Sequence, residues 1–122
     1  MSRDYRKLRT YTESDALVLA VYRATESFPP DERFAMQVQL RRAAVSVVLN
    51  IAEGSTRSTT ADYCRFLELA MGSARECACL LEIAAKLGFG DCERATQLSN
   101  RYDVVCRSLN AMINALRTSP KS

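Results

Sequence analysis

The sequence predicts an all-α protein, an antiparallel up-and-down four-helix bundle, and three observations support this prediction. Proline and glycine are scarce in the 122-residue chain, with 3 and 4 copies, so most of the chain can be helical. Two segments each carry seven apolar positions at alternating spacings of three and four residues, which is typical of helices packed in a bundle. The links between the expected helices are short, which places consecutive helices antiparallel.

The first expected helix covers residues 13–27. Thr12 is a suitable N-cap because its hydroxyl can accept a hydrogen bond from a free backbone N–H, and Asp15 follows three residues later as in a capping box. A Pro-Pro pair at positions 29 and 30 ends this helix, because the residue before a proline disfavours the helical conformation.

The second expected helix begins near Asp31, where acidic residues suit the positive end of a helix dipole, and ends at Gly54. Its apolar residues form two seams, which predicts contact with more than one neighbouring helix. The first seam consists of Phe34, Val38, Val45, Val48 and Ala52, and the second consists of Leu40, Ala44, Val47 and Ile51.

The third expected helix begins near Thr60 and ends before Gly88, and the fourth follows Asp91 as N-cap and ends before Pro120. The apolar seam of the third helix consists of Tyr63, Leu67, Ala70, Ala74, Cys77, Leu81 and Ala84. The seam of the fourth consists of Ala95, Leu98, Tyr102, Val105, Leu109, Met112 and Leu116. Both seams predict packing at a shallow crossing angle.

A narrow polar row interrupts the apolar surface of the second helix. Ser46, Asn50 and Glu53 recur at i, i+4 and i+7 and therefore share one face, where a polar network or another subunit would lie. The helix dipole disfavours a glutamate in the last turn by about 0.3–1 kcal/mol, so we expect Arg57 or another cation to pair with Glu53. We expect Asn50 and Glu53 to be substantially buried and hydrogen-bonded.

Two further features predict close packing between helices. Arg41 interrupts the first seam of the second helix, and a partly buried guanidinium needs a carboxylate or several carbonyl oxygens. We expect Glu76 of the third helix to be its ion-pair partner. Gly72 and Ser73 form a smooth patch in the middle of the third helix, which predicts the close approach of another helix, from this chain or a neighbouring one.

The net charge of the chain is concentrated in an N-terminal arm at residues 1–11, which we expect to be flexible and separate from a bundle at residues 12–119. The chain has a net charge of +3, and residues 1–9 alone account for this value. The arm lies outside the apolar seams, so we expect the bundle to fold without it. The candidate nucleic-acid-binding residues are Arg3, Arg6, Lys7 and Arg9 of the arm, with Arg42 and Arg57 of the bundle. The alternative is a frayed terminus that only aids solubility.

The residue types that most enzyme chemistry needs are missing or misplaced. The chain has no histidine, and it lacks the Glu-x-x-His pairs of helical di-metal sites and the glycine-rich loops that bind phosphate. Its five cysteines are odd in number and contain no CxxC pair, which indicates reduced thiols rather than disulfides or a metal site. With no secretory signal and no apolar run of transmembrane length, we expect a cytoplasmic protein without catalytic residues, metal or cofactor.

An ordered set of motifs gives the sequence a family resemblance. The set consists of QLRRAAVS…NIAEG at Gln39–Gly54, then Arg57, Phe66-Leu67 and Gly72-Ser73…Glu76. It resembles the 23S rRNA intervening-sequence proteins, also called S23-like proteins, from about Val21 to Gly88. Val48 and Leu49 stand where that family usually has proline and serine. The resemblance implies a four-helix bundle that assembles into a cyclic homopentamer, and the family's name implies a connection with RNA.

These observations predict a non-enzymatic homo-oligomeric protein, a scaffold or accessory protein that binds RNA or DNA. The alternative is a protein–protein interaction module without nucleic-acid binding, in which the ring presents sites to another protein. Binding to phosphates weakens steeply as salt rises, so measurements at several salt concentrations distinguish the two. In both cases the chain associates with itself and not with a membrane.

Overall fold

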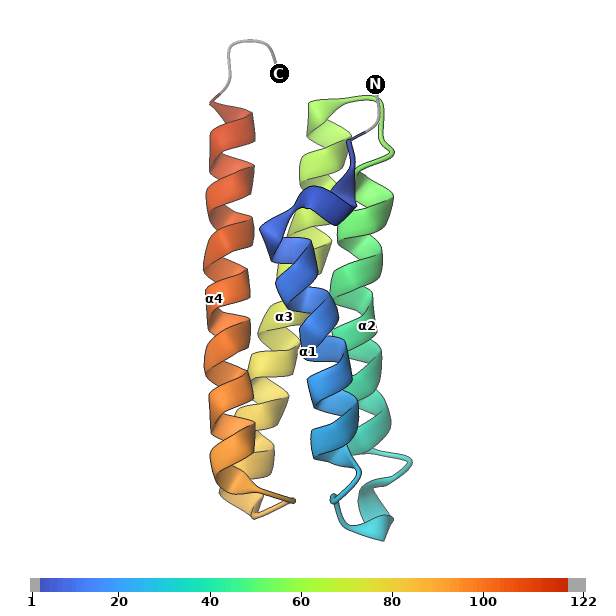
Figure 1. The fold of residues 1–122 in the computed structure, drawn as a ribbon, viewed down its shortest axis with the longest axis vertical. Helices are drawn as coiled ribbons and strands as arrows, with labels where there is room; N and C mark the ends of the chain where they lie inside the picture. Colours follow the sequence, from blue (N-terminus) through green and yellow to red (C-terminus); the bar gives the residue numbers. More distant parts are fainter. Residues whose placement is uncertain (1–2, 119–122) are drawn as a thin grey trace.

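The computed structural model describes residues 3–118, and these residues form an all-α up-and-down bundle (Figure 1). Its four α-helices are α1 (Arg9–Thr25), α2 (Met36–Gly54), α3 (Thr60–Leu87) and α4 (Cys92–Arg117). Two short 3-10 helices, η1 (Tyr5–Lys7) and η2 (Pro30–Glu32), precede α1 and α2. Each α-helix packs against the next, and α1 also packs against α4, which closes the bundle. The fold class predicted from the sequence is confirmed.

The ends of α3 and α4 follow their local sequence signals. The Thr59 hydroxyl accepts a hydrogen bond from the Asp62 N–H, and the Asp91 carboxylate accepts one from the Arg94 N–H, so both helices have side-chain N-caps. Gly88 ends α3 at a φ of 75°, a left-handed conformation that glycine adopts without steric cost. These boundaries confirm the predicted start and end of α3 and the predicted start of α4.

The predicted start of α1 is wrong. Helix α1 begins at Arg9, so residues 9–11 of the expected arm form its first turn, and Thr12 lies inside the helix. The Thr12 hydroxyl donates to the Leu8 carbonyl oxygen at 3.3 Å instead of capping the helix. The early start has a tertiary cause, because Leu8 packs against the core and Tyr11 makes an edge contact with Tyr5 at 4.8 Å between ring centroids.

Helix α2 also begins away from its predicted position, at Met36 rather than near Asp31. The acidic residues expected in its first turn lie in η2, which begins at the second proline of the pair and helps the chain to reverse. The Gln37 amide donates to the Thr25 carbonyl oxygen at 2.8 Å and joins the start of α2 to the end of α1.

The core is built from one face of each helix. The seams predicted for α3 and α4 are buried, except that Met112 and Leu116 near the C-terminal end of α4 are half-buried. In α2 the second predicted seam is buried, but the first is only partly so, with Val48 buried, Val45 and Ala52 half-buried, and the two residues at its start exposed. Phe34 is 86% exposed because it precedes the helix, and Val38 is exposed because no helix covers that side of α2.

Candidate functional site

The N-terminal residues, the α2–α3 connection and the C-terminal end of α4 meet at one end of the bundle (Figure 1). The Arg3 backbone N–H donates to the Ser55 carbonyl oxygen at 3.1 Å, and its Nη1 donates to the Arg57 carbonyl oxygen at 3.3 Å. The Arg3 guanidinium also lies over the Tyr63 ring, 4.2 Å from its centroid. The structure therefore brings together two of the predicted nucleic-acid-binding residues, Arg3 and Arg57.

Arg57 is already engaged with acidic and aromatic side chains. Its Nη2 lies 2.6 Å from Glu53 Oε1, and its Nε lies 4.0 Å from Asp62 Oδ2. Both Arg57 and Arg65 stack on Phe66 at 4.6 Å from the ring centroid. The expected Glu53–Arg57 pair is confirmed. The expected burial of Glu53 is wrong, because its side chain is 57% exposed in the last turn of α2.

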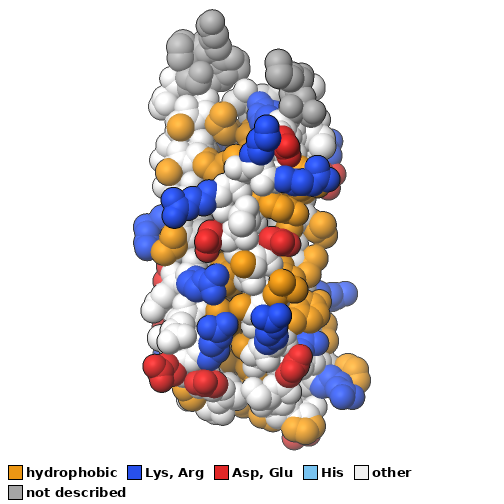
Figure 2. Space-filling view, in the orientation of Figure 1, with side chains coloured by type: hydrophobic (Ala, Val, Ile, Leu, Met, Phe, Trp, Pro, Cys, Tyr) orange, Lys and Arg blue, Asp and Glu red, His pale blue; other side chains and the backbone are white. Residues whose placement is uncertain are grey.

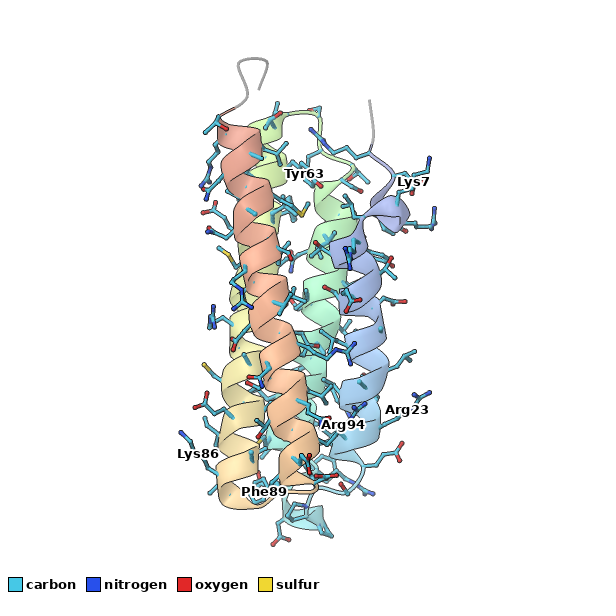
Figure 3. All side chains as sticks on the ribbon, turned by 60° about the vertical axis from the view of Figure 1, so that its left-hand side comes forward. Lys7, Arg23, Tyr63, Lys86, Phe89 and Arg94 are labelled. Carbon is cyan, nitrogen blue, oxygen red and sulfur yellow. The ribbon has the colours of Figure 1, made fainter. Side chains whose placement is uncertain are left out.

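Arg6, Lys7 and Arg9 supply cations that the described residues leave without an ion pair. All three are exposed. Figure 3 shows Lys7 pointing away from the bundle, at the end where the described chain begins. Arg9 lies further round, where it lines a cavity of about 430 Å³ between α1 and α4. We call Arg3, Arg6, Lys7 and Arg57 the basic end.

Arg42 is not part of the basic end. It lies on the exposed side of α2, where it lines two cavities, one beside α1 and one beside α3. The sequence analysis grouped Arg42 with Arg57 by charge alone, because a sequence does not give the distance between two residues. The structure assigns Arg42 to a second surface.

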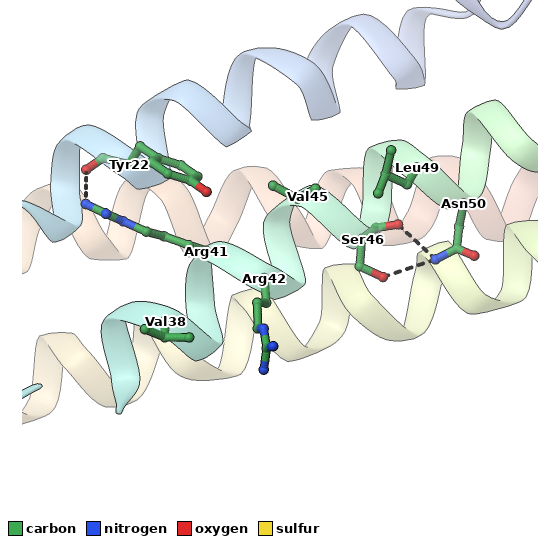
Figure 4. Close-up of a pocket in the computed structure, with 8 residues that line it drawn as sticks. All are labelled: Tyr22, Val38, Arg41, Arg42, Val45, Ser46, Leu49 and Asn50. Carbon is green, nitrogen blue, oxygen red and sulfur yellow. Dashed lines mark hydrogen bonds between the residues drawn. The ribbon is translucent and has the colours of Figure 1, made fainter. Parts of the chain in front are cut away.

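This second surface is the α1–α2 groove, a cavity of about 490 Å³ (Figure 4). Its apolar wall includes Tyr22, Val38 and Leu49, which are 40%, 37% and 60% exposed. The full lining is Tyr22, Val38, Arg41, Arg42, Val45, Ser46, Leu49 and Asn50. The lining contains two cations and no carboxylate, so the groove favours apolar groups accompanied by negative charge.

Arg41 borders this groove but binds α1, and its expected ion pair with Glu76 is wrong. Its Nε donates to the Thr25 hydroxyl at 2.8 Å, and its Nη2 donates to the Tyr22 carbonyl oxygen at 3.0 Å. The guanidinium also lies 4.5 Å from the centroid of the Tyr22 ring. The last carbonyl groups of α1 lack intrahelical partners and carry partial negative charge, which explains why Arg41 binds there. Glu76 instead accepts a hydrogen bond from the Gln39 amide at 3.3 Å.

The polar row of α2 forms a small network with α3. The Ser46 and Ser73 hydroxyls lie 2.8 Å apart, and the Asn50 amide donates to the Ser46 carbonyl oxygen at 2.8 Å and hydroxyl at 3.1 Å. Asn50 is half-buried and hydrogen-bonded as expected, while Glu53 stands outside the network. Gly72, which precedes Ser73, is exposed, and a Cβ built on it would meet no atom within 4 Å. No other helix within the described part of the chain therefore approaches Gly72 closely.

Sequence reasoning did not identify Tyr22 and Leu49 as surface residues of this groove. Leu49 belongs to neither predicted seam of α2, and an apolar residue outside every seam is a signal of exposure that was available. Tyr22 offers the same signal, because it lies outside the apolar stripe of the first expected helix, which consists of Leu17, Ala20, Val21, Ala24 and Phe28.

The environment of one buried thiol and the spacing of the metal-ligating side chains complete the description of the site residues. Burial raises the pKa of the Cys77 thiol to about 12, so it is protonated and unreactive at neutral pH. Within residues 3–118, no group of histidine, cysteine, aspartate and glutamate side chains is placed to hold a metal ion. Likewise, none of the described helices is long and apolar enough to cross a membrane.

The fold and these two surfaces define an all-α four-helix-bundle protein with an exposed, partly apolar groove and a basic end. The chain belongs to the family of 23S rRNA-intervening sequence proteins, whose model matches residues 6–111. The fold is similar to the crystal structure of a protein of the S23 ribosomal protein family from Bacteroides thetaiotaomicron VPI-5482, with a TM-score of 0.76 and 20% sequence identity. That similarity covers 85% of this chain and 97% of the other. A comparison with curated proteins found no match.

Proposed function

We propose that this chain is the subunit of a closed, non-enzymatic homo-oligomeric ring that acts as a scaffold or accessory protein. The observation that carries this proposal is the exposure of large apolar side chains around the α1–α2 groove. Leu19, which precedes Tyr22 by three residues on α1, is also 57% exposed, and Figure 2 shows apolar side chains gathered on the side of α1 and α2. Apolar surface of this kind is typical of an interface. The family resemblance suggests five subunits.

The test of the ring is the mass of the protein in solution. Multi-angle light scattering at micromolar concentration should report a mass near five chains of 13.6 kDa each. A monomer at this concentration would contradict the ring, and a different closed assembly would correct only the subunit number.

The basic end supports nucleic-acid binding as the activity of this ring. The residues of the basic end belong to segments that lie at one end of the subunit, so a ring would repeat the cluster around one rim. Repetition raises the effective concentration of cations without any new interaction. The family's name refers to 23S rRNA, which makes RNA the first nucleic acid to test.

Binding to RNA and to DNA should be measured at several salt concentrations. Replacing Arg6 and Lys7 with glutamine should weaken binding and lower the slope of log affinity against log salt, by about 0.9 for each duplex phosphate that the variant no longer neutralises. The matched control replaces Arg23 and Arg94, which lie toward the opposite end of the bundle (Figure 3). An equal weakening in both variants would contradict a binding site at the basic end.

A protein–protein interaction module without nucleic-acid binding is a second candidate, and the ion pairs of Arg57 and of two further arginines favour it. Arg57 and Arg65 pair with Glu53 and Asp62, and Arg117 pairs with Glu68 at 2.9 Å. Phosphate would have to compete with these carboxylates. An assembled wild-type ring without salt-sensitive affinity for RNA or DNA would select this function.

A further inference from the structure

Two exposed rows of side chains, one on α2 and one on α3, have opposite charges in matching positions. The α2 row consists of Val38, Arg42, Val45 and Leu49, spaced four, three and four residues apart, of which only Val45 is half-buried. The α3 row consists of Leu69, Glu76 and Ile83, spaced seven residues apart. Side chains at these spacings share one face of a helix, and seven residues extend about 10.5 Å along it.

Each row has apolar residues at its two ends and a single charge between them. Leu69 and Ile83 are 48% and 43% exposed, comparable with Val38 and Leu49 on α2. Arg42 and Leu49 are separated by seven residues, as are Glu76 and Leu69. A helix placed antiparallel to α2 could therefore bring Glu76 to Arg42 and Leu69 to Leu49 in the same register.

The two central charges do not satisfy each other within one chain. Both side chains line a cavity of about 540 Å³ between α2 and α3, and no ion pair joins them in the described structure. Glu76 accepts one long hydrogen bond, at 3.3 Å from Gln39, and the Arg42 guanidinium has no hydrogen-bond acceptor among residues 3–118.

We propose that the α3 row of one copy docks in the α1–α2 groove of the next copy, with Glu76 paired to Arg42. This inference rests on the proposed ring and identifies the two surfaces that form it. The groove contains arginines and no carboxylate, so Glu76 supplies the charge that it lacks. The exposed Gly72 beside Glu76 has no side chain to hold the helices apart, and a Cβ there would meet open space within the chain.

Docking between two different surfaces of the subunit, which adjoin along α2, has a consequence for symmetry. The groove lies between α1 and α2, whereas the row that fills it lies on α3, so each subunit would offer one surface of each kind. Such a heterologous contact propagates from subunit to subunit and closes into a ring when the rotation between neighbours allows it. A second copy is therefore the occupant that matches the groove in spacing, apolar character and charge.

Charge reversal tests this pairing. Arg42→Glu and Glu76→Arg should each weaken self-association by about tenfold or more, because each places like charges together at the contact. The double variant should recover most of the wild-type association, because it restores an opposite pair with the charges exchanged. The matched control is Arg107→Glu, which reverses an exposed arginine on α4 and should leave association unchanged.

Association should be measured by sedimentation equilibrium, with circular dichroism as the check that each variant is folded. If the wild type assembles and both single reversals assemble equally well, the ring stands but the proposed contact is wrong. If the double variant remains as weak as the single variants, Arg42 and Glu76 are not paired. If either reversal fails to fold, Arg42→Gln and Glu76→Gln replace them, and unchanged association in both contradicts the contact. A monomeric wild type overturns both the ring and this contact.

Discussion

Arg41 shows how one side chain can join two helices without an ion pair. It binds the Thr25 hydroxyl and the Tyr22 carbonyl oxygen, and the Thr25 hydroxyl in turn donates to the Val21 carbonyl oxygen at 2.8 Å. The end of α1 has no glycine or asparagine cap, so this arginine of α2 satisfies carbonyl and hydroxyl groups there. The interaction fixes the end of the shortest α-helix to its neighbour.

Replacing Arg41 with glutamine should lower the free energy of unfolding by about 1–3 kcal/mol, because a charged donor is removed and its acceptors are left partly unsatisfied. Urea unfolding followed by circular dichroism measures the change. Arg23→Gln is the control, since it removes an exposed arginine from α1 and should cost less than about 0.5 kcal/mol. Equal effects of the two substitutions would show that Arg41 does not act as a cap.

Tyr102 is a second residue whose environment makes a definite prediction. It is fully buried, and its hydroxyl has no hydrogen-bond partner among the described residues. Tyr102→Phe should raise the free energy of unfolding by about 1 kcal/mol, because a poorly satisfied polar group leaves the core. A decrease of similar size in urea unfolding would indicate that the hydroxyl is bound to a buried water.

At the scale of elements, α2 departs most from its predicted environment. It has two apolar seams in the sequence, but the bundle fully covers only the seam of Leu40, Ala44, Val47 and Ile51, and leaves the start of the other seam exposed. The exposed seam contributes to the α1–α2 groove. Gly54 ends α2 where the sequence predicted, but close packing rather than a left-handed conformation explains the glycine. A Cβ at this position would lie 2.7 Å from Phe66 Cβ and 3.2 Å from Tyr63 Cδ1.

Gly54→Ala should therefore lower the free energy of unfolding by about 1–3 kcal/mol, since Phe66 Cβ cannot rotate away and the helices must separate. Gly72→Ala is the matched contrast, because its new methyl group meets open space in mid-helix and should stabilise the chain by about 0.5–1 kcal/mol. Denaturant unfolding at low protein concentration compares the two. Similar signs for both substitutions would contradict the packing role of Gly54.

At the scale of the whole molecule, the N-terminal residues are part of the packed structure. Tyr5 and Leu8 pack against the core, and the Arg3 backbone is bonded to the α2–α3 connection. The expectation that the arm lies outside the apolar seams of the bundle is therefore wrong. The basic residues of the arm alternate with Tyr5 and Leu8 in one short segment, so a deletion removes both the charge and the packing.

Deleting residues 1–9 should lower the free energy of unfolding by about 2–3 kcal/mol, because it exposes apolar surface covered by Tyr5 and Leu8 and removes the first residue of α1. Replacing Arg6 and Lys7 with glutamine should leave stability unchanged within about 0.5 kcal/mol. Thermal and urea unfolding compare the two variants. If the deletion leaves stability unchanged, the packing of the arm contributes little, and truncation becomes a clean test of nucleic-acid binding.

The sequence by itself determined the helical class, the boundaries of α3 and the buried seams of α3 and α4. Apolar spacing, N-caps and glycines are local signals, and they specify which residues of a helix face inward whatever the neighbour is. The Glu53–Arg57 pair could also be predicted from the sequence, because residues four apart on a helix, or just beyond its end, are neighbours by geometry.

Only the tertiary structure decided which seam of α2 is covered, which group binds Arg41 and where the arm lies. Each of these depends on distances between segments far apart in the chain, and the sequence contains no direct measure of such distances. Arg41 and Glu76 have opposite charges and could have formed an ion pair, but the guanidinium of Arg41 binds the Thr25 hydroxyl and the Tyr22 carbonyl oxygen at the end of α1 instead. The exposed groove has the same origin, because α2 has more apolar surface than a single bundle of four helices can cover.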